Sequence, residues 1–482
     1  MQAAGASAVA LSGCSTGSGG SGDARPNVIV LMCDALRADH VYGDRASTPN
    51  MDALRREGLS FTRTYPEAMP TVPARNSMLS GRRQFPWRGW RDYPGLVDSA
   101  GWEPLDSVRD TFTSAFKRAG YWTALVTDNP FLAYAQPYEP LRRSFDHFAR
   151  RGGQVGGQST GVSERELRRW VPPQMADEAS RERVRKYLAN VFHPKNGETG
   201  QFAERVFRDG VEALGRAARQ PPFAMIVDTF EPHEPWTPPR KYVDMYGDPD
   251  YRGPEPARPL YRRVSKYLSP SEAAVLVPRM KALYAADITM TDRWLGVFMD
   301  RLHDLKLDRE TIIVLTGDHG VFVGERDFSG KSSEQLYPEL IQVPLVVVDP
   351  DRRAAGEATD YFASLHDIGP TILSMAGVKA PRSMDGVDLS PLLSGGRMPD
   401  RPYAYGGYKN SFFIRTDRWA LSGVNRHGQL KLYDLKNDPG ETRNVAEQRP
   451  GTARELQAIV KRRAGGALPY YFDPPNKGPG AA

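Results

Sequence analysis

The sequence is poor in cysteine, in long apolar runs near its N-terminus and in net charge. Its 482 residues contain only two cysteines, Cys14 and Cys33, so a disulfide framework is excluded. The apolar run that precedes Cys14 is far shorter than the roughly 20 residues of a membrane-spanning helix. Lysine and arginine total 64 against 58 aspartate and glutamate, a formal charge of +6 at pH 7. This modest excess permits an anionic ligand, and without an aromatic-studded basic stripe it predicts no nucleic-acid partner.

Residues 1–24 predict an export leader and tether. A run of small apolar residues at 3–13 precedes Cys14, and a Gly/Ser-rich stretch follows. The pattern resembles the end of a bacterial lipoprotein signal, whose cysteine is lipidated after cleavage. No Lys or Arg precedes the run, so residues 1–5 look like the middle of a twin-arginine signal whose start codon was placed too late. We expect an exported protein, lipid-anchored at Cys14 on the outer face of a bacterial cell membrane; the alternative is a disordered tail.

After the leader, strand and helix patterns alternate. Apolar runs rich in β-branched residues predict buried central strands at 27–32, 223–230 and 311–316. Helical patterns lie between them, the longest at about 273–303. After about residue 399 the pattern changes to short alternating segments and a last helix near 452–463. These features predict an α/β fold with a mostly parallel mixed sheet flanked by helices, and a small C-terminal α+β subdomain.

Composition divides the chain into a leader (1–24), a main domain (25–398) and a C-terminal subdomain (399–482). Within the main domain, a polar, basic and Gly-rich stretch at about 150–210, with helical pieces around residue 165 and at 181–191, predicts an insertion over the rim of the functional site. A solvated surface segment is the alternative interpretation. No internal repeat is evident.

The stretch 69–82 predicts a loop that delivers a hydroxyl group to the start of a helix. Pro73 suits a first helical turn and Gly81 suits a helix end. Thr71 is then placed at the positive end of the helix dipole, where backbone N–H groups favour an anion. Arg75, one turn further, can point to the same anion. The alternative is that Thr71 only caps the helix.

Carboxylates and an imidazole follow two of the predicted central strands. Asp34 comes after the strand at 27–32, and Asp318 and His319 come after the strand at 311–316. Ligands of open α/β sheets bind at the carboxyl ends of the strands. Together with the Thr71 hydroxyl, these side chains predict a divalent-metal site with mixed oxygen and nitrogen ligands. Singly, each aspartate could be a helix cap or a turn residue.

Short motifs recur along almost the whole chain after the leader. They are 25–28, 34–40, 48–52, 73–75, 79–82, 232–236, 317–320, 330–331 and 432–442. In content and order these motifs resemble those of the sulfatase family of the alkaline-phosphatase-like superfamily.

The resemblance implies roles for seven residues. Asp34, Asp318 and His319 would bind the metal, and Thr71 falls where sulfatases carry the Cys or Ser that is oxidised to formylglycine. Arg75 is the arginine of that signature and would stabilise the nucleophile and the anion. His233 and Lys331 match residues that contact the sulfate oxygens or assist the leaving group. Without the family context, His233 could stack on Trp236 and Lys331 could be a solvated loop residue.

The sequence departs from the sulfatase pattern at three places. Thr71 cannot be converted to formylglycine by the known route, and Ala35 stands where many members have a second Asp. The residues Thr127-Asp128-Asn129-Pro130 replace a common Lys-Trp-His cluster. Superfamily members that cleave phosphodiesters or phosphonates use a metal-bound Thr directly, usually with two zinc ions. The second zinc set would need Asp228, His233 and His366.

We therefore expect a metal-dependent hydrolase that cleaves a sulfate or phosphate-type ester through a metal-bound Thr71 nucleophile. Arg75 and Lys331 are expected to bind the ester oxygens, and His233 to protonate the leaving alcohol. One divalent ion is expected, Ca²⁺ by family or Zn²⁺ or Mn²⁺ by the imidazole ligand. Alternatives are a phosphodiesterase, a phosphonate hydrolase, a phosphoryl transferase or an inactive anion-binding envelope protein. The expected partners are an anionic ester substrate and a membrane through the lipid anchor alone.

Overall fold

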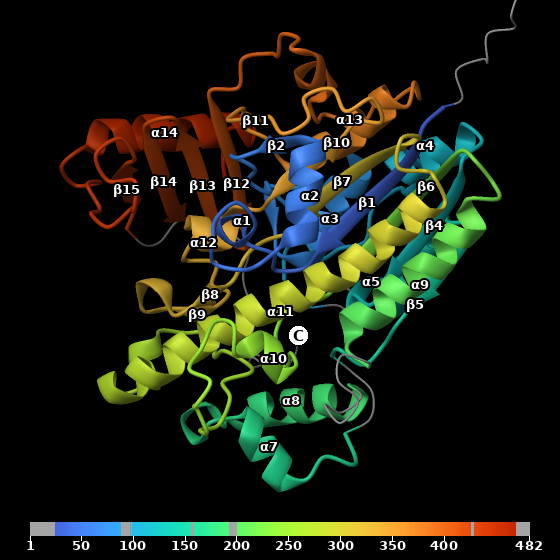
Figure 1. The fold of residues 1–482 in the computed structure, drawn as a ribbon. Helices are drawn as coiled ribbons and strands as arrows, with labels where there is room; N and C mark the ends of the chain where they lie inside the picture. The colour runs from blue at the N-terminus through green and yellow to red at the C-terminus, as the bar shows by residue number, and fades with distance from the viewer. Residues whose placement is uncertain are drawn as a thin grey trace, which may run out of the picture.

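The computed structural model describes residues 25–87, 97, 99–155, 159–191, 200–425 and 429–468; the predicted leader with Cys14 lies outside these residues. The centre of the fold is an eight-stranded mixed sheet with the order β11-β2-β10-β7-β1-β6-β4-β5 (Figure 1). Its strands are β1 (Asn27–Cys33), β2 (Leu59–Phe61), β4 (Trp122–Thr127), β5 (His147–Arg150), β6 (Phe223–Thr229), β7 (Thr311–Gly317), β10 (Leu345–Val348) and β11 (Ala358–Thr359). The predicted α/β class and the mostly parallel sheet are confirmed.

Three central strands end at the same level of the sheet. β1 lies between β6 and β7, runs parallel to both, and is buried along its whole length. The register pairs Cys33 with Thr229 on one side and with Gly317 on the other. Continuous apolar sequence suits these strands because helices cover both faces. The residues that follow Cys33 and Gly317 are consequently neighbours in space.

Two hydrophobic clusters pack the helices onto the two faces of the sheet. α2 (Pro49–Glu57), α9 (Phe202–Ala217) and α11 (Pro270–Asp304) cover one face, where Ile29 and Leu31 point. α3 (Thr71–Ser80), α4 (Phe112–Arg118) and α13 (Ile368–Met375) cover the other, where Val28 and Val30 point. The alternating directions of side chains along β1 explain this division. α11 has 35 residues and runs across the molecule in Figure 1.

The polar stretch after β5 forms the expected helical pieces, α7 (Glu164–Trp170) and α8 (Glu178–Asn190). The next helix, α9, was not separated from this stretch in the sequence prediction. α9 packs against the central sheet and α11, with Phe202, Val206 and Phe207 buried. Its apolar positions follow the helical period. Arg and Glu residues lie between them, so the composition alone indicates a polar stretch.

The C-terminal part forms a five-stranded sheet with the order β15-β14-β13-β12-β3. Its antiparallel strands are β12 (Tyr403–Tyr408), β13 (Ser411–Thr416), β14 (Trp419–Val424) and β15 (Lys431–Asp434), and α14 (Pro450–Arg463) packs beside them. The fifth strand, β3 (Ala68–Met69), pairs in parallel with β12. β3 directly precedes Thr71, so the C-terminal sheet anchors the segment that carries the predicted nucleophile.

The remaining elements are short connections. They are α1 (Ala38–Val41), α5 (Pro130–Tyr134), α6 (Glu139–Arg143), α10 (Arg240–Val243), α12 (Pro338–Ile341), β8 (Phe322–Val323) and β9 (Ser329–Gly330). Among the helices of the described ranges, none is both long enough and apolar enough to cross a membrane.

Candidate active site

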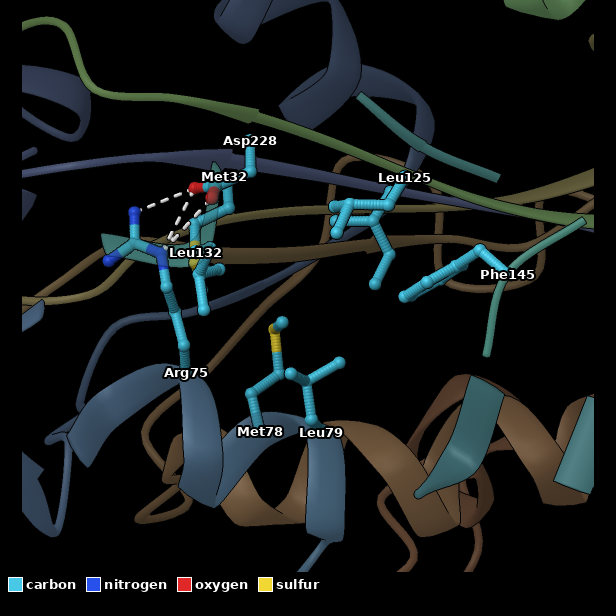
Figure 2. Close-up of a pocket in the computed structure, with 9 residues that line it drawn as sticks. Met32, Arg75, Met78, Leu79, Leu125, Leu132, Phe145 and Asp228 are labelled. Atoms are coloured by element: carbon cyan, nitrogen blue, oxygen red, sulfur yellow. Dashed lines mark hydrogen bonds and ion pairs between the residues drawn. The ribbon is translucent and has the colours of Figure 1, made fainter. Parts of the chain in front are cut away.

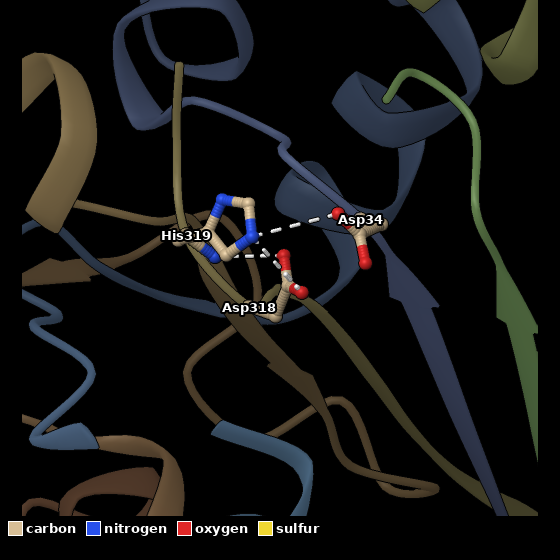
Figure 3. Close-up of side chains that lie close together, drawn as sticks. All are labelled: Asp34, Asp318 and His319. Carbon is tan, nitrogen blue, oxygen red and sulfur yellow. Dashed lines mark hydrogen bonds and ion pairs between the residues drawn. The ribbon is translucent and has the colours of Figure 1, made fainter. Parts of the chain in front are cut away.

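The ends of β1 and β7 bring three predicted ligands together. Asp34, Asp318 and His319 are fully buried, and one ligand atom from each lies within 4.8 Å of the others (Figure 3). Asp34 follows β1 and the other two follow β7, so the parallel pairing of these strands makes the cluster. In the described part of the chain, no other group of His, Cys, Asp and Glu side chains meets this distance.

Thr71 lies at the same place, at the start of α3. Pro70 occupies the cap position of this helix, and no side chain caps it. The Oγ1 atom of Thr71 instead lies 3.3 Å from Nε2 of His319. The helix ends as predicted at Gly81, whose φ of +59° is favourable for glycine. The alternative in which Thr71 only caps the helix is therefore contradicted.

The hydrogen bonds of His319 fix its tautomer. Its Nδ1 lies 2.9 Å from the carbonyl oxygen of Gly320, which can accept only from a protonated nitrogen. Burial lowers the pKa of His319 to about 4, so the ring is neutral near pH 7. Nε2 then carries a lone pair, and it lies 3.6 Å from Asp34 and 3.5 Å from Asp318. This atom faces both the hydroxyl group and the carboxylates.

Arg75 occupies the centre of the carboxylate cluster. Its guanidinium lies 2.5 Å from Asp318, 2.6 Å from Asp228 and 3.1 Å from Asp34. Figure 2 shows this side chain rising from α3 toward Asp228. Although burial lowers it, the pKa of Arg75 is raised well above its ordinary value by these carboxylates, Asp228 first. Arg75 is therefore a fixed cation one helical turn from Thr71.

Apolar side chains enclose a very small cavity beside Arg75. Met78 and Leu79 of α3 and Leu125 of β4 line a cavity of only about 10 Å³ beside the Arg75–Asp228 pair (Figure 2). A space of that size is about one water molecule wide and cannot admit a substrate. This enclosure restricts the guanidinium to the side that faces the carboxylates.

The cluster suits a divalent cation. Asp34, Asp228 and Asp318 carry three negative charges when ionised, against the positive charge of Arg75 within the cluster and that of Lys331 beside it. Neither oxygen of Asp34 accepts a hydrogen bond, although both are buried. Burial, together with the charge of Asp318, raises the pKa of Asp34 well above its ordinary value. A cation held by Asp34, Asp318 and His319 would remove this penalty, because buried carboxylates need a counter-charge.

His233 and Lys331 form a pair beside this cluster. The Nζ atom of Lys331 lies 2.7 Å from Nε2 of His233, and Nδ1 of His233 lies 2.7 Å from the carbonyl oxygen of Glu234. Burial and the Lys331 charge lower the pKa of His233 well below its ordinary value. His233 stacks on Phe230, not on Trp236 as the alternative reading had it. The Lys331 charge partly opposes the rise in the pKa of Asp34, so Lys331 acts electrostatically on the cluster.

The positions that depart from the sulfatase pattern have structural roles. The backbone N–H of Ala35 donates to Asp318 at 2.9 Å. Thr127 donates to Asp228 at 2.9 Å, and Asn129 caps α5. Asp128 accepts hydrogen bonds from Gln154 and from a backbone N–H, and burial raises its pKa to about 8. Ala35 and Thr127 thus hold two of the carboxylates around Arg75, whereas the printed partners of Asp128 lie outside the metal-ligand cluster.

The second zinc set does not assemble. Asp228 is paired with Arg75, and His233 is paired with Lys331. His366 lies elsewhere, beside Arg83 and Asp367. Among the described residues these three do not form a group with the spacing of metal ligands. The role of Asp228 as the main partner of Arg75 was missed in the sequence, where only its position at the end of a central strand gave a signal.

Comparison with known proteins identifies the family. The Sulfatase family model matches residues 26–378, and a model for the C-terminal part of N-sulphoglucosamine sulphohydrolase matches residues 324–464. An arylsulfatase from Clostridium perfringens is 25% identical over 93% of this chain and 96% of its own length. The multifunctional alkaline phosphatase superfamily protein PehA from Trinickia caryophylli is 26% identical, with 88% and 91% covered.

Solved structures share the fold. The phosphonate monoester hydrolase of Agrobacterium radiobacter superposes with a TM-score of 0.66 at 22% identity and covers 92% of this chain and 96% of its own. A protein solved with its substrate D-glucosamine-2-N,6-O-disulfate superposes with a TM-score of 0.67 at 20% identity, with 94% and 100% covered. The chain belongs to the sulfatase family. Family and relatives together support an ester-hydrolysing enzyme, and the family generally binds a divalent metal.

Replacing Asp34 with asparagine tests the metal site. Protein purified without chelator is expected to contain about one equivalent of divalent metal, and Asp34→Asn is expected to lose it because a carboxylate ligand becomes a weaker amide ligand. Metal analysis of the purified proteins measures this directly. Asp128→Asn is the matched control, since Asp128 is also a buried carboxyl after a strand but lies outside the cluster. Equal metal content in both variants would contradict the assignment.

Proposed function

We propose that this protein hydrolyses a sulfate or phosphate-type ester and that Thr71 is the nucleophile. The observation that carries this proposal is the placement of the Thr71 Oγ1 atom 3.3 Å from His319 Nε2, inside a buried cluster that also holds Arg75. A hydroxyl group becomes a useful nucleophile when an adjacent group takes its proton or a metal makes it more acidic. His319 is the adjacent group at this position, and a metal held by Asp34, Asp318 and His319 would supply the second aid.

Formation of a covalent ester on Thr71 is the first chemical step. The Thr71 oxygen attacks the sulfur or phosphorus atom in line with the leaving oxygen, while the hydroxyl proton passes to an acceptor. His319 Nε2 is the acceptor at hydrogen-bond distance. A divalent metal held by Asp34, Asp318 and His319 would make the hydroxyl more acidic and offset negative charge on the ester oxygens. His319 cannot ligate a metal and accept the proton with the same atom, so these roles are alternatives.

Lys331 is the proton donor that suits the leaving group. His233 holds its Nδ1 proton on the Glu234 carbonyl and accepts from Lys331 at Nε2. The transferable proton of the pair is therefore on Lys331, whereas the sequence prediction gave this role to His233. As the bond to the leaving oxygen breaks, Lys331 Nζ gives that oxygen a proton. Water then hydrolyses the Thr71 ester and releases sulfate, phosphate or phosphonate.

A phosphorus ester is the second candidate substrate, and the nature of Thr71 favours it. Formylglycine hydrate has a second hydroxyl that expels sulfate, and threonine has none. A phosphoryl group carries more charge than a sulfuryl group, and Arg75, Lys331 and a metal can neutralise it. Transfer to another alcohol in place of water would use the same covalent ester.

Matched aryl esters of sulfate, phosphodiester and phosphonate test the proposal. Initial rates are measured for protein treated with EDTA and for protein supplied with Ca²⁺, Zn²⁺ or Mn²⁺. We expect turnover of at least one ester, restored by metal after EDTA treatment. Full activity in EDTA would indicate that His319 accepts the Thr71 proton and that the reaction needs no metal. No turnover of any ester would favour the inactive anion-binding protein.

A further inference from the structure

A cavity of about 310 Å³ lies where the end of α3 meets the C-terminal sheet. Side chains from the segment after α3, from the turn before α13, from β12 and from α14 line it, among them Arg83, His366, Tyr405 and Arg463. The length of α3, about 15 Å for its 10 residues, separates this end from Thr71. The volume is in the range of pockets that bind small molecules. The cavity is therefore a candidate binding site that the proposed reaction does not use.

His366 brings an unpaired hydrogen-bond donor to this cavity. Its side chain is buried, and its Nε2 atom lies 3.5 Å from Nη2 of Arg83, a group that can only donate. Burial and the charge of Arg83 lower the pKa of His366 to about 3 against the opposing effect of Asp367, so the ring is neutral near pH 7. The neutral ring accepts at Nε2 and carries its proton on Nδ1, which has no hydrogen-bond partner among the described residues. An acceptor group of a ligand would satisfy this buried donor.

Two guanidinium groups supply further donors. Arg463 donates from Nε to the Tyr403 hydroxyl at 2.7 Å, and within the described ranges its two terminal nitrogens have no hydrogen-bond or ion-pair partner. Arg83 lies over the Tyr405 ring, 3.9 Å from the centroid, and donates to the Tyr405 carbonyl oxygen at 2.9 Å. Burial raises the pKa of Tyr405 and the charges of Arg83 and Arg463 oppose the rise, so both cations lie near this side chain.

The charges around the cavity favour a ligand with a single negative charge. The third arginine of the lining, Arg401, is neutralised by Asp367, whose two oxygens both accept from its guanidinium. The other two arginines share the lining with two carboxylates, Asp385 and Asp400. These carboxylates would repel a dianion such as a phosphate ester. They can accept hydrogen bonds from hydroxyl groups of a ligand whose own carboxylate contacts the arginines.

We propose that this cavity binds a small hydroxy acid, a molecule with one carboxylate and several hydroxyl groups. The carboxylate accepts from His366 Nδ1, Arg83 and Arg463, and the hydroxyl groups donate to Asp385 and Asp400. This site is separate from the ester-cleaving centre, and it does not depend on the proposed function.

Calorimetric titration of the purified protein with three probes tests the site. D-Gluconate has the charge and the hydroxyl groups, D-glucitol has the hydroxyl groups alone, and acetate has the charge alone. We expect gluconate to bind the wild type at least about tenfold tighter than either partial probe, about the value of one hydrogen bond to a charged group. No binding of gluconate, or equal affinity for gluconate and either partial probe, would overturn the proposal.

Substitutions in the lining locate the bound gluconate. Arg463→Gln and His366→Phe are each expected to weaken gluconate binding about tenfold, because each removes a donor to the carboxylate. Arg462→Gln is the matched control, since Arg462 is the adjacent exposed arginine of α14 and does not line the cavity. It is expected to keep the wild-type affinity. Arg463 is also exposed, so Arg463→Gln is expected to fold normally even if His366→Phe does not. Wild-type affinity in Arg463→Gln would overturn the site.

Discussion

Thr71→Ala is expected to lower kcat/KM by a factor on the order of a thousand or more, because it removes the atom proposed to form the covalent ester. Initial rates on the ester that the wild type prefers measure this loss. Thr71→Ser keeps the hydroxyl group at the start of α3 and is expected to retain activity within about tenfold. Sulfatases oxidise a Ser at this position to formylglycine, so the intact mass of the Thr71→Ser protein is measured to show that its serine is unmodified.

We expect the Thr71→Ala variant to fold as the wild type does. Thr71 makes no side-chain cap of α3, so its removal deprives the helix of no capping bond. Circular dichroism and thermal unfolding then distinguish a chemical loss from a structural one. Equal rates for wild type and Thr71→Ala would show that the reaction proceeds without this hydroxyl group, and the anion-binding alternative would return if both proteins were inactive.

Replacing Arg75 with methionine is expected to lower the free energy of unfolding by about 3–5 kcal/mol in EDTA, the range for removing one partner of a buried ion pair. Asp34, Asp228 and Asp318 would be left without their shared cation. Methionine fills a similar volume, so the loss reports charge more than packing. Urea denaturation of both proteins measures it, and added Ca²⁺ should restore part of the loss because a cation replaces the missing charge.

Arg418→Met is the control for this comparison. Arg418 is 54% exposed and pairs with Asp434 on the surface, where an ion pair contributes at most about 1 kcal/mol. If Arg75→Met in EDTA were as stable as wild type, the carboxylates would have to be neutral in the metal-free protein. The raised pKa of Asp34 makes it the group that would take up the proton.

The main parts of the site could be predicted because local sequence signals coincide with fold rules. Continuous apolar runs before Asp34 and before Asp318 mark central parallel strands, and parallel strands present their carboxyl ends at one edge of the sheet. Pro73 and Gly81 mark the helix that starts at Thr71. These are short-range patterns, so a single sequence displays them.

Other features depend on pairings that no local pattern records. The contact of Arg75 with Asp228 joins residues 153 positions apart, and the contact of Lys331 with His233 joins residues 98 positions apart. α9 was hidden in a polar stretch, because its buried face is defined only once α11 and the sheet are beside it. The pairing of β3 with β12 links the Thr71 segment to the C-terminal sheet across more than 300 residues.

By itself, the sequence determined the α/β class, the family pattern and the residues proposed to carry the chemistry, because strand periodicity and helix signals are local properties of the chain. Only the tertiary structure decided how those residues divide the work. It paired His233 with Lys331 and gave Arg75 its three carboxylate partners. Charge, burial and hydrogen-bond direction in a site are set by residues distant in sequence, and they exist only after the chain has folded.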